Sequence, residues 1–67
     1  MLKNKLKEIR LKEYMMDNKT EFAKMLGVPL QTYKNWEDNK SYPNLNSAYE
    51  IAEKLNKIVT DIWYLDK

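Results

Sequence analysis

The chain has 67 residues, with 12 Lys and Arg against 10 Asp and Glu and a net charge of +2. This length predicts one small domain, residues 1–67, whose core provides only about 3–5 kcal/mol of stability unless a disulfide, a metal or a second subunit contributes. The absence of Cys and His excludes disulfides and zinc fingers and removes the commonest general base, so we expect no metal, no cofactor and no enzymatic activity.

The composition is that of a folded domain outside the membrane. Hydrophobic residues make up 43% of the chain and charged residues 33%. No run approaches the ~20 apolar residues of a membrane span, and MLKNKLKEIR at the start is too charged for a signal peptide. We therefore expect a cytoplasmic protein. Its positive charge lies in residues 1–40, with a net charge of +3, whereas residues 41–67 have a net charge of −1.

The first two helices are predicted from apolar spacing and capping residues. A helix over 2–16 places its apolar residues at helical intervals: Leu2, Leu6, Ile9 and Met16. Asn18 begins a second helix, 19–26, and Glu21 three positions later completes a pattern typical of a capping box. Gly27 is placed to end this helix.

Three further helices complete an all-α prediction without strands. Pro29 favours a helix over about 30–38, which Asn39 ends because Asn adopts the left-handed conformation readily. Asn44 caps a fourth helix with an inward stripe: Leu45, Ala48, Tyr49, Ala52 and Leu55. A last short helix, about 59–65, contains Val59, Ile62 and Trp63.

Residues 19–38 are the most informative stretch of the sequence. An eight-residue helix, a turn that opens with the only glycine, Gly27, and a second helix have the spacing of a helix-turn-helix. Ala23, four positions before Gly27, lets the two helices approach closely. Tyr33 and Trp36 fall three positions apart on the inward face of the second helix.

Six segments in order then resemble a known family over essentially the whole chain: LKEIR, EFAKMLGV, QTYKNWE, KSYPNL, AYEIAEKLN and DIWYL. They are similar to segments of the phage repressor and Cro-like helix-turn-helix regulators. The resemblance implies a compact five-helix, lambda-repressor-like domain. It also implies that the third helix enters the major groove of double-stranded DNA, usually as a dimer on a palindromic site.

The side chains on the outward face of helix 30–38 are of types that can contact the edges of DNA bases. Gln31 and Asn35 can each form a bidentate pair with adenine, and Lys34 can reach guanine O6 and N7. Leu30 offers an apolar contact to a thymine methyl. We predict these four residues as base contacts; a solvated polar face remains the alternative for any one of them.

A second set of residues is predicted to contact the DNA backbone. Lys19 lies at the start of the second helix, where free N–H groups attract phosphate. Lys40, Ser41 and Tyr42 follow the third helix, in a loop that the resemblance places against the next phosphate. Thr32 lies within the third helix, at the flank of its outward face. Contacts of this kind fix register and carry no sequence information. A plain solvated loop is the alternative.

Arg10, the only arginine, is expected to have a structural role. The resemblance implies an ion pair between Arg10 and Glu37, the glutamate that ends the recognition helix. A guanidinium suits a partly buried, bidentate pair of this kind. The alternative is an exposed arginine that contributes little.

Three large side chains in a row near the C-terminus, Trp63, Tyr64 and Leu65, predict a dimer surface. A short helix cannot turn all three inward. We expect Trp63 to complete the core with Ile62, so that Tyr64 or Leu65 remains exposed as an apolar patch. A symmetric homodimer would place two half-sites one helical turn apart, about 34 Å, on an inverted repeat. A monomer with a frayed tail is the alternative.

The leading hypothesis is a sequence-specific DNA-binding transcriptional regulator, a repressor from a mobile element or a bacterium. The alternative is a protein-interaction module, such as an antitoxin or adaptor, that keeps this fold. The outward face of helix 30–38 separates the two, because a protein binder has no reason to hold Gln31, Lys34 and Asn35 together.

Overall fold

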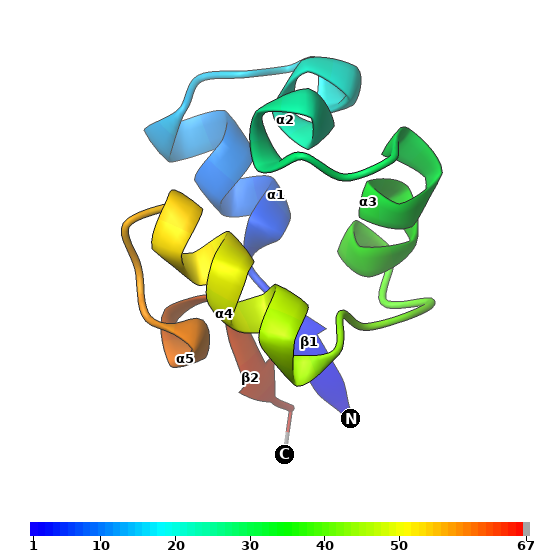
Figure 1. The fold of residues 1–67 in the computed structure, drawn as a ribbon, viewed down its shortest axis with the longest axis vertical. Helices are drawn as coiled ribbons and strands as arrows, with labels where there is room; N and C mark the ends of the chain where they lie inside the picture. Colours follow the sequence, from blue (N-terminus) through cyan, green and yellow to red (C-terminus); the bar gives the residue numbers. More distant parts are fainter. Residues whose placement is uncertain (67) are drawn as a thin grey trace.

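Short helices make up most of the structure, a computed structural model that describes residues 1–66. The helices surround one core, and two short strands pair near the chain ends (Figure 1). In chain order the elements are β1 (Leu2–Asn4), α1 (Leu6–Glu8), η1 (Ile9–Glu13), α2 (Lys19–Leu26), α3 (Leu30–Glu37), α4 (Leu45–Lys54), α5 (Val59–Ile62) and β2 (Trp63–Leu65). The π-helical turns of η1 continue α1 directly. Within residues 1–66, no helix has the length and apolarity needed to cross a bilayer.

The two strands correct the prediction of a purely helical chain. β1 and β2 pair antiparallel, with Leu2 opposite Leu65 and Asn4 opposite Trp63. The predicted helices 2–16 and 59–65 are therefore wrong at these ends. Trp, Tyr and Leu fit a pleated surface well, and each short segment satisfies its backbone groups through the other.

The first helix also ends early, at Glu13 instead of Met16. Met15 has a φ of 52°, which no continuing right-handed helix accommodates. Its side chain is 84% exposed. The chain therefore leaves the helix here and turns toward α2.

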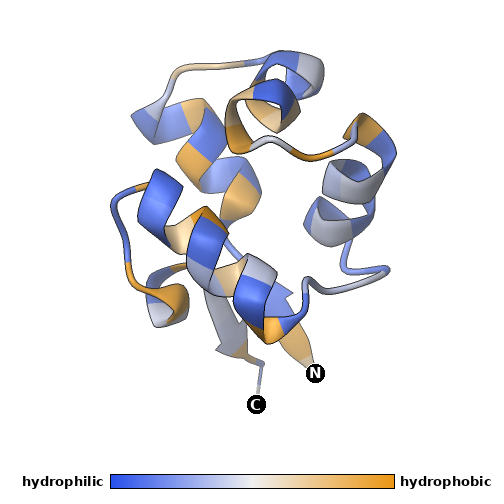
Figure 2. Cartoon of the chain, viewed as in Figure 1, coloured by the Kyte–Doolittle hydropathy of each residue, from blue (hydrophilic) through white to orange (hydrophobic). Residues whose placement is uncertain are grey.

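One hydrophobic core joins the helices and Trp63 of β2. Hydrophilic and hydrophobic residues alternate around each helix, as amphipathic helices require (Figure 2). The buried hydrophobic residues are Leu6, Ile9, Phe22, Ala23, Leu26, Tyr33, Trp36, Ala48, Ile51, Ala52, Leu55, Ile62 and Trp63. Tyr14 and Tyr33 both pack edge-on against Phe22, with ring centroids 5.6 and 5.5 Å from it.

The buried stripe of α4 differs from the predicted one. Ala48, Ala52 and Leu55 are buried, but Leu45 and Tyr49 are 72% and 62% exposed. The buried residues, which include Ile51, follow the i, i+3, i+4, i+7 spacing of one helix face. Leu45 and Tyr49 lie outside that face and remain in solvent.

The predicted cap residues are confirmed, but the capping box at Asn18 is only half formed, since within residues 1–66 no hydrogen bond joins the Glu21 side chain to the Asn18 N–H. The Asn18 side chain accepts hydrogen bonds from the N–H groups of Thr20 and Glu21, at 2.8 and 3.3 Å. Asn44 accepts one from the Ser47 N–H at 2.8 Å. Gly27 ends α2 with a φ of 75°, and Asn39 follows α3 with a φ of 60°.

The end of α2 has a second support that the sequence did not predict. The Lys54 Nζ, from the last turn of α4, donates to the Leu26 carbonyl oxygen at 2.7 Å. This bond satisfies one of the carbonyls that a helix end leaves without a partner. A Cβ placed on Gly27 would lie 3.0 Å from the same Nζ.

The substitution Gly27→Ala should therefore destabilise the domain in two ways. It places a side chain in the left-handed conformation, at a cost of about 1–2 kcal/mol. It also pushes Lys54 away from Leu26. Urea unfolding followed by circular dichroism should show a lower midpoint with an unchanged slope.

Met15→Gly provides the matched comparison, because Met15 already occupies the left-handed region without a crowded side chain. It should stabilise the domain by up to about 1 kcal/mol. Equal and small effects of both substitutions would contradict the assigned role of Gly27.

Candidate nucleic-acid interface

The turn between α2 and α3 is held by backbone hydrogen bonds around Gly27. The Gly27 N–H donates to the carbonyls of Ala23 and Lys24, and the Val28 N–H donates to Ala23 at 3.0 Å. Val28 packs against the core. Pro29, in extended conformation, then leads directly into α3. α3 consequently stands at the edge of the molecule, with one side open to solvent (Figure 1).

Two of the predicted base contacts lie fully on the open side of α3. Tyr33 and Trp36 are 0% and 5% exposed and fix the inward face. Gln31 and Lys34 are exposed, and Asn35 is half-buried.

The other two residues of α3 that are predicted to contact DNA, Leu30 and Thr32, are less accessible. Leu30 is half-buried and packs against the core. Thr32 is half-buried as well. Leu30 therefore gives only part of its surface to a ligand on this side of α3.

The two amides on the open face contact each other. Gln31 Nε2 donates to Asn35 Oδ1 at 3.1 Å, one helical turn along α3. This bond orders both side chains side by side. A carbonyl oxygen has two lone pairs, so Asn35 Oδ1 can still accept a second hydrogen bond from an adenine amino group.

The loop after α3 folds back onto the helix end. The N–H groups of Lys40 and Ser41 both donate to the Asn35 carbonyl, at 2.8 and 3.4 Å. Their backbone donors are thus occupied, and a phosphate here would be bound by side chains. Lys40 is exposed and Tyr42 is 43% exposed, whereas Ser41 is half-buried.

A buried polar network joins α3 to the rest of the domain. Arg10 and Glu37, the expected pair, are in bidentate contact, with Nε–Oε2 and Nη2–Oε1 distances of 3.3 Å. Their side chains are only 3% and 5% exposed. Arg10 Nη1 also donates to the carbonyls of Met16 and Asp17, both at 2.9 Å.

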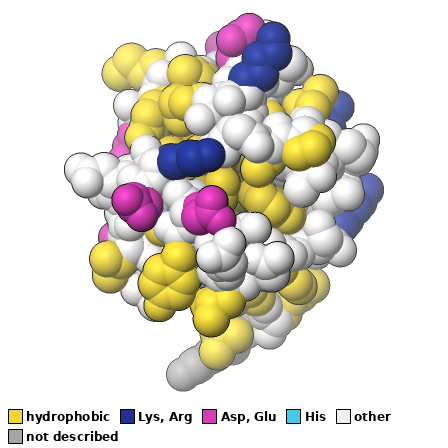
Figure 3. Space-filling model, viewed as in Figure 1, with side chains coloured by type: hydrophobic (Ala, Val, Ile, Leu, Met, Phe, Trp, Pro, Cys, Tyr) yellow, Lys and Arg dark blue, Asp and Glu magenta, His cyan; other side chains and the backbone are white. Residues whose placement is uncertain are grey.

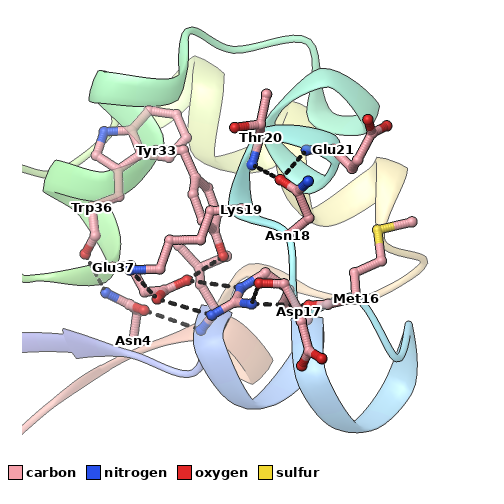
Figure 4. A network of polar contacts seen from close by, with 12 residues as sticks. Asn4, Met16, Asp17, Asn18, Lys19, Thr20, Glu21, Tyr33, Trp36 and Glu37 are labelled. Carbon is pink, nitrogen blue, oxygen red and sulfur yellow. Dashed lines mark hydrogen bonds and ion pairs between the residues drawn. The ribbon is translucent and has the colours of Figure 1, made fainter.

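Two further groups converge on the same carboxylate, as Figure 4 shows for Lys19, Tyr33 and Glu37. The Tyr33 hydroxyl donates to Glu37 Oε2, and Lys19 Nζ lies 3.4 Å from Oε1. The phenol of Tyr33 thereby obtains a partner inside the core. Lys19, which is predicted to contact phosphate, is engaged with Glu37 in the free protein.

These contacts shift the ionisation of the network. Burial disfavours the charge on Glu37, but hydrogen bonds from Tyr33 and Arg10 outweigh it and lower the pKa of Glu37. Burial likewise opposes the charge on Arg10, yet Glu37 raises the Arg10 pKa above its ordinary value. Burial and the adjacent Glu37 carboxylate raise the pKa of Tyr33. All three groups keep their usual charge states at neutral pH.

Asn4 contributes to this region although no feature of the sequence predicts it. Its Nδ2 donates to the Trp36 carbonyl at 2.6 Å and to Asn39 Oδ1 at 3.1 Å. Its Oδ1 accepts from the Leu6 N–H at 3.0 Å. No local pattern could indicate these contacts, since Asn4 and Trp36 are 32 positions apart.

The predicted dimer surface needs a correction at Trp63. Its side chain is 5% exposed and belongs to the core, so it cannot contact a partner. Tyr64 and Leu65 are 40% and 65% exposed. The alternation of side chains along β2 turns Trp63 onto the helices, and Leu65 extends past the edge of the core.

A surface hollow of about 700 Å³ lies between α4 and α5, away from α3, and is lined in part by Tyr49, Asn56, Ile58 and Val59. A protruding helix with a polar face suits insertion into a groove of the ligand, not enclosure of a small molecule.

Residues 6–60 match the helix-turn-helix family. The chain belongs to this family. A protein of Archaeoglobus fulgidus named "Uncharacterized HTH-type transcriptional regulator" is 35% identical over 66 residues, which cover 98% of this chain and 90% of that protein. These matches confirm the resemblance to helix-turn-helix regulators that the sequence shows.

Removing one partner of the buried pair should damage this helix-turn-helix domain severely. Arg10→Met leaves the Glu37 carboxylate buried without its guanidinium, at a cost of about 3–5 kcal/mol. The double substitution Arg10→Met/Glu37→Gln should recover much of that loss, because no buried charge remains. As a control, Lys3→Ala breaks an ion pair with Asp66 whose side chains are 42% and 51% exposed, and should cost less than about 1 kcal/mol in urea unfolding.

The pH dependence gives a separate measurement on the wild type. The Glu37 pKa is lower in the folded state than its ordinary value of 4.5, so the unfolded state binds the proton first. The stabilisation is therefore present above about pH 4.5 and is lost as the pH falls through the folded pKa. Parallel acid unfolding of the wild type and the Arg10→Met/Glu37→Gln variant would contradict this assignment.

Proposed function

We propose that this helix-turn-helix protein is a DNA-binding transcriptional regulator that reads a specific double-stranded site with α3. The observation that carries the proposal is the open face of α3. Gln31, Lys34 and Asn35 lie together on this face, which points away from the buried side of the helix. These side chain types form the base-specific hydrogen bonds of the major groove. Membership of the family and the name of the Archaeoglobus fulgidus relative support the same function.

The contacts divide into two classes by position. Gln31, Lys34, Asn35 and the exposed part of Leu30 are proposed to read bases. A second group is proposed to bind phosphates on either side: Lys19, Thr32, Lys40, Ser41 and Tyr42. Lys19 would exchange part of its contact with Glu37 for a phosphate, since both are anions within reach of one flexible ammonium.

We further propose repression as the regulatory outcome. A domain bound in the major groove of a promoter excludes other proteins from the same DNA, and this requires no additional surface. Activation would need a second specific contact with the transcription machinery.

In vitro selection of bound duplexes tests the proposal directly. The wild type should enrich one sequence from random DNA. Gln31→Ala and Asn35→Ala should each relax the preference at one base pair, by about 1–3 kcal/mol. Lys40→Ala should weaken all duplexes alike and reduce the slope of log affinity against log salt by about one.

Lys7→Ala is the matched control, because it removes an exposed lysine of α1 that we do not place at the interface. It should leave both the selected sequence and the salt slope unchanged. Failure of the wild type to prefer any duplex over random DNA at low salt would overturn the proposal and favour the protein-interaction alternative.

We also propose that two copies bind an inverted repeat through the end of β2. Hydrophobic side chains are visible over much of the face in Figure 3, including the end of the molecule where the chain termini lie. Leu65 is 65% exposed there and Leu2, opposite it, is half-buried. Both are leucines on the same side of the sheet, so a second copy would remove them from water.

The substitution Leu65→Asp tests this surface without disturbing the core. It should shift sedimentation equilibrium toward the monomer and reduce affinity for a full inverted repeat more than for an isolated half-site. Met15→Asp, at an even more exposed apolar position away from the sheet, serves as the control. Unchanged self-association of the Leu65 variant would exclude this surface.

A further inference from the structure

Within residues 1–66, Asn4 is the only residue of β1 whose side chain forms a hydrogen bond with α3, and it also bonds Asn39 in the turn that follows. The Trp36 carbonyl that it contacts lies in the last turn of α3 and also accepts the Asn39 N–H at 3.0 Å. One amide thus holds both the helix end and the turn that follows. Figure 4 shows the Asn4 side chain beside Trp36.

The same turn places the residues proposed to meet DNA. The Lys40 N–H donates to the Asn35 carbonyl at 2.8 Å, so the loop and the base-reading helix are tied at this point. A shift of the turn would move Lys40 relative to Asn35. Phosphate contacts fix the register in which base contacts form, so the spacing between these two residues affects recognition.

The backbone that presents Asn4 is itself fixed. Asn4 pairs with Trp63, which is buried in the core. The following residue, Lys5, donates its N–H to the Ile62 carbonyl at 2.8 Å. The Asn4 side chain is therefore anchored by the sheet on one side and by the start of α1, through Leu6, on the other.

We propose that Asn4 is a positioning residue for DNA recognition, which sets the end of α3 and its loop from the β1–β2 sheet without touching DNA. This inference rests on the proposed function. It also makes the sheet a direct link between Leu65, on the proposed dimer surface, and the recognition helix. Two positions along β2 separate Leu65 from Trp63, the partner of Asn4.

Asn4→Ser separates the two roles of the side chain. A serine hydroxyl can still accept from the Leu6 N–H at the start of α1, but it is too short to reach Trp36. Affinity for the selected site should fall about two- to tenfold, the worth of one hydrogen bond. Affinity for random DNA should not change, because the substitution keeps all charges.

A second variant tests the partner. Asn39→Gly keeps the positive φ of this position and removes the side chain that accepts from Asn4. Combined with Asn4→Ser it should add little to the loss, since both remove parts of one network. Lys3→Ala, on the same strand but directed toward Asp66, should leave the ratio of specific to random affinity unchanged.

Amide hydrogen exchange measures the positioning without DNA. In Asn4→Ser the amides of Asn39 and Lys40 should exchange faster, while the Ala48 amide of α4 keeps its wild-type rate. Unchanged exchange at Asn39 and Lys40 would overturn the inference whatever the DNA result. Equal acceleration at Ala48 would also overturn it, because the substitution would then act through global stability.

The two proposals fail in different ways. If the wild type selects no duplex, the proposed function is wrong, and the exchange experiment alone decides whether Asn4 positions α3. If the wild type selects a site and Asn4→Ser keeps the full ratio of specific to random affinity, the inference is wrong and the proposed function stands.

Discussion

The orientation of α3 depends on one buried carboxylate. Glu37 receives the Arg10 guanidinium, the Tyr33 hydroxyl and the Lys19 ammonium, which come from η1, α3 and α2. A buried ion pair adds little net stability, because the desolvation of both charges offsets their attraction. Its contribution here is geometric, since Arg10 of η1 and Lys19 of α2 both contact Glu37 and thereby tie α3 to these two helices. The core alone, built from side chains that tolerate repacking, would not define the placement of α3 as sharply.

Two other polar tethers act at helix ends in the same way. Lys54 binds the Leu26 carbonyl at the end of α2, and Asn4 binds the Trp36 carbonyl at the end of α3. Both satisfy carbonyls that a helix leaves free, and both reach across the chain. Since carbonyls at a helix end have no partner within the helix, these tethers add order without competing with its own bonds. The helix-turn-helix is thus supported at its turn and at its far end.

Local signals in the sequence were enough to predict most of the helical framework. Asn18, Gly27, Asn39 and Asn44 act on their nearest neighbours, so their roles are readable from the sequence alone. β1 was not predictable in this way, because Leu2 and Leu6 have helical spacing and the partner of β1 lies at the other end of the chain. The contact between Arg10 and Glu37 came from the resemblance, since no spacing rule relates residues 27 positions apart.

The position of the cations supports the proposal that two copies of this domain bind DNA together. The net charge of +2 is the sum of a basic N-terminal segment, residues 1–40, and an acidic C-terminal segment, residues 41–67. Only the charges on the side of the domain that is proposed to face DNA attract phosphate. Of the lysines proposed there, Lys19 already has Glu37 as a partner, whereas Lys34 and Lys40 are exposed. Each neutralised phosphate contributes to affinity through the release of counterions, so few contacts mean weak binding by one copy. Two copies joined through the sheet would double these contacts, and the same sheet holds α3 through Asn4.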